Sequence, residues 1–471
     1  MNMPRASRFL LLPVCLAATA CAVGPDYHPP QPALPGAWRE AVSDNKPAAA
    51  HIAQPWWQDF NDPILIALIE RALANNENLA IAAERVNEAR GLRESAFGGL
   101  FPQIGGDLDA SRGAPGAATT NSILSTYQGA FDATWEVDLF GGQRRRVETQ
   151  DAETGATEAA YRNASLTLAA EVAREYILLR QFQAQMETTN QTADLQKHLY
   201  DIAQDRYKGG LVSTLDVAQA KALFETTEAR LPDFERQIAA SSYRLSVLIG
   251  ENPGTLADLV VTSAPIPVAV QLPILDAPAD IIRRRPDVAE AERKLAAATA
   301  AQGVAISALY PKISLSALFG TQYGTLPVFD YAATHELWNL GAGVSMPILN
   351  FGLIDGQIDA ADSRQVQALH HYKQTVLQSL ADVETDLSNL SKEKKRDTML
   401  EEANQSAQHA VKVARDRYRN GLSDFTSVLQ AEQQSFAVQL DLIVSRSTES
   451  QDVVALHKAL GDNPAILNQE D

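Results

Sequence analysis

The chain of 471 residues consists of two halves of related sequence, so its fold has to contain one structural unit twice. Residues 206–211 (RYKGGL) recur as residues 417–422 (RYRNGL), a displacement of 211 residues. Three further matches flank this one: 139–141 with 350–352 and 249–253 with 460–464 at the same displacement, and 100–104 with 309–313 at 209 residues. Matched segments separated by one two-residue length change predict a duplicated unit.

Each half is predicted to run as a helix, two strands, a very long helix, a turn and a return helix. Residues 353–419 contain no proline and would form a helix about 100 Å long at 1.5 Å per residue. Its apolar side chains alternate spacings of four and three: Val376, Leu380, Val383, Leu387 and Leu390. The counterpart, residues 143–208, carries a similar stripe: Leu168, Val172, Tyr176, Leu179, Phe182 and Met186. We interpret both stripes as helix-packing surfaces.

Glycines are predicted to end both long helices. Gly210 and Gly421 lie where a left-handed residue stops a helix, and Ser213 or Ser423 can cap the helix that follows. Each half therefore contains a helical hairpin, with return helices near residues 214–249 and 424–460, the first of them interrupted by a proline, Pro232. Two arginines near the ends of the long helices are expected to satisfy terminal carbonyl groups: Arg206 and Arg417.

Four short segments alternate apolar and polar side chains, the pattern of strands with one apolar face. In residues 127–137, Tyr127, Phe131 and Trp135 face one way and Asp132 faces the other. The other segments are residues 104–110, 313–319 and 338–346. Lengths near ten residues favour tilted strands that span a membrane, and a half-buried soluble sheet is the alternative. Four strands cannot close a barrel, and open edges cannot remain in lipid, so spanning demands an oligomer of two or three copies.

The N-terminal segment is predicted to be a lipoprotein signal peptide. A basic start precedes the apolar residues 9–17, and Ala18-Thr19-Ala20 precede Cys21. Cys21 is therefore expected to carry lipid, although ordinary cleavage that leaves a free or buried thiol is the alternative. Ala22, in place of an aspartate that would retain a lipoprotein in the inner membrane, indicates the outer membrane.

The chain is acidic, with a formal net charge of -18 at pH 7. This charge argues against nucleic acid or anionic lipid as binding partners. Carboxylates that line a water-filled path would favour cations, and a solvated acidic surface explains the same composition.

Four short motifs resemble the outer-membrane efflux protein family, to which TolC belongs. They are residues 23–27 (VGPDY), 56–60 (WWQDF), 139–141 (LFG) and 284–287 (RRPD). Because of Cys21, the sequence is similar to the lipidated OprM- and NodT-type outer-membrane factors of resistance-nodulation-division systems. We expect the tryptophans of the second motif to lie in a core rather than to form a ligand cage.

The resemblance implies an α+β membrane protein that forms a homotrimer. Long helical hairpins would build a periplasmic α-barrel, and four transmembrane strands per chain would contribute to a twelve-stranded β-barrel in outer-membrane lipid. The implied partners are a periplasmic adaptor, or membrane fusion protein, and an inner-membrane pump. The expected divisions of the chain are a signal peptide (1–20), an extended lipid-anchored segment (21–60), a first repeat (61–253), a linker (254–279), a second repeat (280–464) and a tail (465–471).

The family resemblance directs attention to the hairpin turns, where such tunnels close. Asp216 and Tyr418 match family positions that hold the entrance shut, and a phenol that donates to a carboxylate forms a strong, breakable link. Asp424 either forms a ring of carboxylates around the entrance or caps a helix. Tyr207 completes the candidate gate. The residues expected to contact the adaptor are at the tips of the turns: Gly210, Leu211, Gly421 and Leu422.

The sequence therefore predicts an exit duct for drugs or other small molecules, and not an enzyme. The eight histidines are scattered, and neither a zinc-type HExxH motif nor a GxSxG elbow occurs, so no catalytic residue, metal site or cofactor is expected. A type I secretion duct and a poreless periplasmic adaptor or structural coiled-coil lipoprotein are the alternatives. Strand pairs in both halves argue against the poreless alternatives. The cargo, the pump and the adaptor are not specified by the sequence.

Overall fold

A computed structural model describes residues 22–39, 55–113, 124–270, 277–326 and 331–462. The chain divides into two compact units, each assembled from segments of both halves of the sequence. The first contains Met1–Gln31, Arg85–Glu158 and Glu290–Gln374, and the second contains Pro32–Glu84, Ala159–Ala289 and Thr375–Asp471. Cys21 lies outside the described residues.

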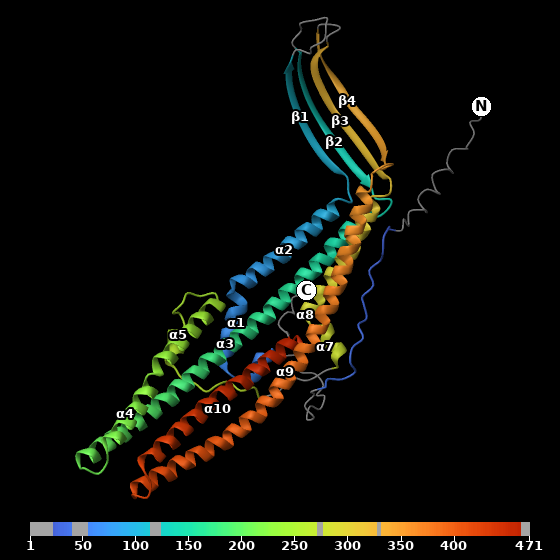
Figure 1. Ribbon diagram of the computed structural model, residues 1–471. Coiled ribbons are helices and arrows are strands. Elements are labelled where there is room, and N and C mark those ends of the chain that lie inside the picture. The colour runs from blue at the N-terminus through green and yellow to red at the C-terminus, as the bar shows by residue number, and fades with distance from the viewer. Residues whose placement is uncertain (1–21, 40–54, 114–123, 271–276, 327–330, 463–471) are drawn as a thin grey trace. The chain divides into compact units, whose positions relative to one another are not determined.

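The helices and strands appear in a matching order along the two halves (Figure 1). After the short helix η1 (Trp56–Phe60), the first half contains α1 (Pro63–Asn75), α2 (Glu77–Gly98), β1 (Gln103–Gly113), β2 (Leu124–Val137), α3 (Gly142–Lys208), α4 (Thr214–Glu228) and α5 (Leu231–Leu248). After α6 (Ala257–Val261), the second contains α7 (Pro278–Arg284), α8 (Pro286–Ser307), β3 (Lys312–Leu326), β4 (Tyr331–Ser345), α9 (Leu353–Arg419) and α10 (Phe425–Leu460).

The single helix expected before each strand pair is in fact two helices. In the first half Asn76 separates α1 from α2, since its side chain accepts the Leu79 N–H at 3.0 Å and donates to the Leu248 carbonyl at 2.9 Å. In the second half Pro286 begins α8, and a proline disfavours the helical conformation for the residue before it, Arg285, which is extended. η1 similarly interrupts the segment that was expected to be extended up to residue 60.

The long helices and the break in the first return helix at Pro232 agree with the sequence prediction. α3 and α9 each contain 67 residues. α4 ends at Glu228 and α5 begins at Leu231, with Pro232 in the first turn, where its missing N–H has no cost. The corresponding helix of the second half, α10, continues without a break for 36 residues.

The four strands form one antiparallel sheet in the order β1-β2-β3-β4 (Figure 1). Gln103 pairs with Thr134 in the first hairpin, and Lys312 pairs with Ser345 in the second. One face is covered by exposed apolar side chains: Ile104, Leu108, Tyr127, Phe131, Phe319, Tyr323, Trp338, Leu340 and Val344. The predicted alternation is therefore present in all four strands, which contain 11, 14, 15 and 15 residues.

The main hydrophobic core lies in the second unit. It joins η1 and α1 to the predicted stripes of α3 and α9, including Tyr176, Leu179, Val383, Leu387 and Leu390. Trp56 and Trp57 are each 3% exposed within it, which confirms their assignment to a core. Among the described residues, no helix combines the length and the hydrophobicity that crossing a membrane requires.

In the first unit, residues 22–27 are held against the start of α3. The Val23 N–H donates to the Phe140 carbonyl at 3.0 Å. The buried guanidinium of Arg145 donates to the carbonyls of Val23 and Gly24 and, at 2.7 Å, to the Asp26 carboxylate. Gly24 has a φ of +90°, and a Cβ placed on it would lie 2.5 Å from the Cα of Gly303. Only glycine therefore fits this position without displacing the segment.

Candidate functional site

The first hairpin turn, between α3 and α4, is a glycine-terminated helix end. Gly210 has a φ of +70°, its N–H donates to the Tyr207 carbonyl, and the Leu211 N–H donates to the Arg206 carbonyl, both at 2.9 Å. This is the Schellman arrangement, which satisfies carbonyl groups that the helix leaves unpaired. The Leu211 side chain is 77% exposed at the tip of the turn, and Tyr207 is also exposed.

The second turn, between α9 and α10, repeats this arrangement. Gly421 has a φ of +71°, and the Leu422 N–H donates to the Arg417 carbonyl at 2.8 Å. The Arg417 guanidinium donates to the carbonyl of Leu422, which lies in the turn beyond the end of α9 and not among the terminal carbonyls of the helix that Arg417 was expected to satisfy. Leu422 is 67% exposed. Both turns thus present one exposed leucine directly after a left-handed glycine.

The helices that follow the turns are capped by different residues. Ser213 caps α4 as predicted, in a capping box with Asp216. The expectation that Ser423 caps α10 is wrong, because the Asp424 carboxylate accepts the Ser427 N–H at 3.0 Å and the Ser427 hydroxyl at 2.6 Å. These hydrogen bonds from Ser427 hold the pKa of the Asp424 carboxyl below its usual range. Asp424 therefore caps α10, which is one of the two alternatives that the sequence offered for it.

The predicted hydrogen bond between Asp216 and Tyr418 is absent from this structure. The Asp216 carboxylate accepts the Ser213 N–H and hydroxyl, each at 2.9 Å. The Tyr418 hydroxyl is buried without a hydrogen-bond partner. The capping box supplies a local donor for Asp216, and a local bond of this kind requires no ordering of a second hairpin.

A different contact joins the two turns. The guanidinium carbon of Arg206, near the end of α3, lies 4.7 Å from the centroid of the Tyr418 ring on α9. The Tyr418 ring in turn packs against Phe425, with ring centroids 5.1 Å apart. Arg206 was expected only to satisfy helix carbonyls, so the structure corrects its role. A cation over an aromatic face is attracted by the ring quadrupole, by about 0.5–2 kcal/mol depending on solvation.

Beneath this contact a small hydrophobic cluster packs the first hairpin against the second. Its buried members are Ala203, Ala220, Leu223, Phe425, Val428 and Leu429. Tyr418 borders the cluster. Release of the two hairpins from each other would therefore expose apolar area as well as break the Arg206–Tyr418 contact.

The RRPD motif, residues 284–287, lies far from the turns in sequence and serves as a structural bracket in the second unit. Arg285 donates to both oxygens of Asp287 at 3.0 and 2.7 Å and to Asp382 at 3.2 Å. It also donates to the Ala459 carbonyl at 2.8 Å, so one buried guanidinium ties α7 and α8 to α9 and α10. A planar guanidinium suits this two-point recognition of a carboxylate.

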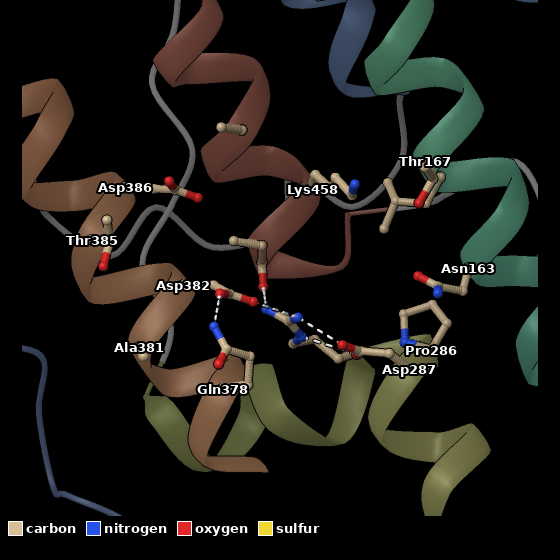
Figure 2. A pocket seen from close by; sticks show the side chains of 14 residues that line it. Asn163, Thr167, Pro286, Asp287, Gln378, Ala381, Asp382, Thr385, Asp386 and Lys458 are labelled. Carbon is tan, nitrogen blue, oxygen red and sulfur yellow. Dashed lines mark hydrogen bonds and ion pairs between the residues drawn. The ribbon is translucent and has the colours of Figure 1, made fainter. Parts of the chain in front are cut away.

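Beside the bracket is a cavity of about 600 Å³ lined by residues of α3, α8, α9 and α10 (Figure 2). The side chains of Asp386 and Lys458 both line it, and the charge of Lys458 favours the ionised form of Asp386. Burial, and then the charge of Asp382, raise the pKa of Asp386 to about 6. Burial also raises the pKa of Asp452 to about 6, together with the charges of Glu393 and Asp386.

Sequence reasoning did not single out these carboxyl groups. A signal was present, because Asp382 and Asp386 are spaced by four directly beside the apolar stripe that contains Val383 and Leu387. An acidic pair on a buried helix face indicates perturbed ionisation. Across the described ranges, no three His, Cys, Asp or Glu side chains are grouped closely enough to hold a metal ion.

Comparison with known proteins identifies the family. The sequence model described as "Outer membrane efflux protein" matches residues 68–251 and again 277–462. The chain is 30% identical over 462 residues to the pyoverdine export outer membrane protein OpmQ of Pseudomonas aeruginosa, with 96% of each chain covered. It is 29% identical to the toluene efflux pump outer membrane protein TtgC of Pseudomonas putida, with 95% of this chain and 94% of the relative covered.

A solved structure shows the same fold along nearly the whole chain. The outer-membrane channel OprN matches with a TM-score of 0.87 at 29% identity, covering 94% of this chain and 100% of the channel. The members found are channel and transport proteins rather than enzymes. Because the family model matches most of the sequence and a relative at 30% identity spans 96% of it, the chain belongs to the outer membrane efflux protein family.

Proposed function

We propose that the chain is the outer-membrane exit duct of a tripartite efflux system and works as a homotrimer anchored by lipid on Cys21. The observation that carries the proposal is the four-stranded sheet, one face of which exposes large apolar side chains such as Leu108 and Trp338, at 93% and 72%. Exposed apolar area of this kind is unfavourable in water and favourable in lipid. Three such sheets would supply the twelve strands of a closed barrel.

The hairpin turns are the proposed gate and docking surface. Leu211 and Leu422, with the glycines that precede them, form two similar exposed tips. Two similar tips suit an adaptor that binds both hairpins of the chain in the same way. The Arg206–Tyr418 contact and the apolar cluster beneath it hold the two hairpins together, so an adaptor that separates them would have to compensate for both. Asp424 lies beside the second tip, and in a trimer its three copies would bring negative charge to the entrance.

The cargo class is proposed broadly, as drugs or other small molecules. The relatives named for pyoverdine export, toluene efflux and cation efflux are similar in sequence to this chain along 95–96% of its length, at 28–30% identity. Selection therefore belongs to the pump, and the duct is passive.

Single-channel conductance of the purified protein in planar bilayers tests the proposal. We expect a low conductance for the wild type that rises when the Arg206–Tyr418 contact is removed. A folded trimer that shows no conductance in the wild type or in any variant would contradict a pore. Mass measurement of the detergent complex would establish separately whether the trimer exists.

A further inference from the structure

The apolar face of the sheet is hollowed over its two central strands. A depression of about 420 Å³ is lined by two alanines that pair across these strands, Ala133 of β2 and Ala317 of β3. Ile104 of β1 and Leu340 of β4 flank the pair in the same row of the sheet and also line the depression. The hollow, which we call the alanine depression, therefore exists because two small side chains lie between two large ones.

Aromatic rings border the alanine depression on one side. The next row of side chains on this face contains Phe131, Phe319 and Trp338, which pair across β2, β3 and β4. All three rings are exposed. An aromatic wall beside a floor of small residues forms a concave apolar surface.

Such a surface suits a flexible hydrocarbon chain. The floor and the walls offer it no charged partner on this face, and they surround a bound chain on several sides. A hydrocarbon chain can follow an irregular floor, and it gains dispersion contacts with each wall that it touches. A rigid polar ligand would lose its hydration here without gaining hydrogen bonds.

The described chain begins beside the end of β2, and both segments belong to the first unit. Gly141, four residues after the end of this strand, has a φ of +82°, and a Cβ placed on it would lie 2.6 Å from the Cα of Ala22. One peptide bond joins Ala22 to Cys21, and consecutive Cα atoms lie about 3.8 Å apart. A group attached to Cys21 therefore starts near this end of β2.

The alanine depression is within the length of one acyl chain from that point. Ala133 is four residues before the end of β2, which is about 13 Å along a strand. The hydrocarbon core of a bilayer is about 30 Å thick, so the acyl chains of one leaflet cover about 15 Å. Trp135 lies between the depression and the strand end, and its Nε1–H donates to the Leu100 carbonyl at 2.9 Å. A tryptophan with a satisfied polar group is typical of the membrane–water interface.

We propose that an acyl chain attached to Cys21 binds in the alanine depression of its own chain. This inference rests on the lipid anchor in the proposed function and names the protein surface that receives the lipid. The anchor then does more than hold the chain at the membrane, because its hydrocarbon packs against β2 and β3 and completes this face of the sheet.

Attachment favours this acyl chain over those of the surrounding bilayer. Bilayer lipids offer the same chemistry, but they exchange freely, whereas a chain on Cys21 cannot diffuse away. Its point of attachment is also fixed, because Arg145 donates to the carbonyls of Val23 and Gly24 and to Asp26. An acyl chain that starts from a fixed point loses less freedom on binding than a free lipid does.

Photo-crosslinking of the full-length chain in outer membranes tests the proposal. The photoreactive residue p-benzoylphenylalanine replaces Phe319 in one variant and Tyr323 in the matched control. Both positions are exposed on the same face of β3, and they are about 13 Å apart along the strand. Mass spectrometry of the digested product shows whether the peptide that carries the lipidated Cys21 is joined to the photoreactive residue.

We expect the lipidated N-terminal peptide to be joined at position 319 several-fold more than at position 323, in a product of monomeric size on a denaturing gel. Adducts of free phospholipid alone at position 319 would assign the depression to bilayer lipid and overturn the proposal. Equal yields at the two positions, or a product of dimeric size, would also overturn it.

Filling the alanine depression provides an independent test. Ala317→Leu, with the photoreactive residue at position 319, places a side chain where the acyl chain would lie and should remove most of the cross-linking. Ala133→Leu should have the same effect from the neighbouring strand. The matched control is Ala110→Leu, which adds the same volume to the same face of β1, six residues beyond Ile104, and should leave the yield unchanged. Undiminished cross-linking in both filled variants would overturn the proposal.

The mass of the N-terminal peptide separates this inference from the proposed function. A lipidated Cys21 that forms no cross-link at position 319 would overturn the binding site and leave the anchor in place. An unmodified Cys21 in the mature wild-type protein would overturn both the anchor and this inference, and the channel would still be tested by its conductance.

Discussion

The guanidinium of Arg206 lies 4.7 Å from the centre of the Tyr418 ring and joins the two hairpin turns of the chain. The Tyr418 hydroxyl takes no part, because it is buried without a partner, and Asp216 is occupied by its own helix cap. The ring, rather than the hydroxyl, is therefore the group that connects the hairpins.

The distinction predicts different effects of two substitutions at one position. Tyr418→Phe keeps the aromatic face and should leave single-channel conductance unchanged, whereas Tyr418→Leu and Arg206→Gln should raise the open fraction up to about tenfold if the contact contributes about 1.4 kcal/mol. Planar-bilayer recording distinguishes them. A rise with Tyr418→Phe equal to that with Tyr418→Leu would instead identify the hydroxyl as the lock.

Arg285 should be far more important for stability than its neighbour Arg283. Arg285→Gln leaves the partly exposed carboxylates of Asp287 and Asp382 without their buried cation, and we expect a loss of about 1.5–3 kcal/mol. Arg283→Gln removes an ion pair whose arginine side chain is 79% exposed, for a loss of about 0–1 kcal/mol. Denaturant unfolding followed by circular dichroism measures the stability of both variants. Similar losses of stability would contradict the structural role of Arg285.

Acidification through pH 6 should stabilise the helical region around Asp386 and Asp452. Each has a pKa raised to about 6 by burial, so the folded chain binds protons between about pH 4 and pH 6 that the unfolded chain does not. The cost of ionising them is fully present above about pH 6 and is removed as the pH falls from about 6 to about 4. Asp386→Asn combined with Asp452→Asn should flatten the pH dependence of the melting temperature between about pH 4 and pH 7.

The matched control for this pH experiment is Asp441→Asn, because Asp441 is exposed on the same helix as Asp452. Its melting curves should follow those of the wild type at each pH. A double variant whose pH dependence is as steep as that of the wild type would assign the effect to other groups.

Gly24→Ala should release residues 22–27 from α3. The new Cβ would lie 2.5 Å from the Gly303 Cα in a conformation that costs an L-residue about 1–2 kcal/mol. Hydrogen exchange at the Val23 amide, which donates to Phe140, should accelerate. The control is Gly36→Ala, where a Cβ meets nothing within 4 Å, and it should leave the exchange rate of the Val23 amide unchanged. An unchanged exchange rate in Gly24→Ala would show that the segment accommodates the methyl group.

Local features of the sequence predicted most of the elements correctly. The alternation in residues 127–137, the proline-free residues 353–419 and the positions of Gly210 and Gly421 depend on short-range sterics and periodicity, and β2, α9 and both turns formed as expected. Competition between neighbouring side chains was less predictable. Ser423 and Asp424 are both good caps, and the choice between them depends on where the helix begins.

What the sequence by itself determined is therefore the duplicated order of helices, strands and turns, together with the motifs that relate the chain to its family. Only the tertiary structure decided which distant groups meet. Arg206 and Tyr418 are 212 positions apart, and Arg285 reaches Asp382 and Ala459 across three helices. The raised pKa of Asp386 likewise depends on burial by other elements. Such contacts arise from packing between segments that are remote in the chain. The periodicity of a single segment does not indicate which other segments pack against it.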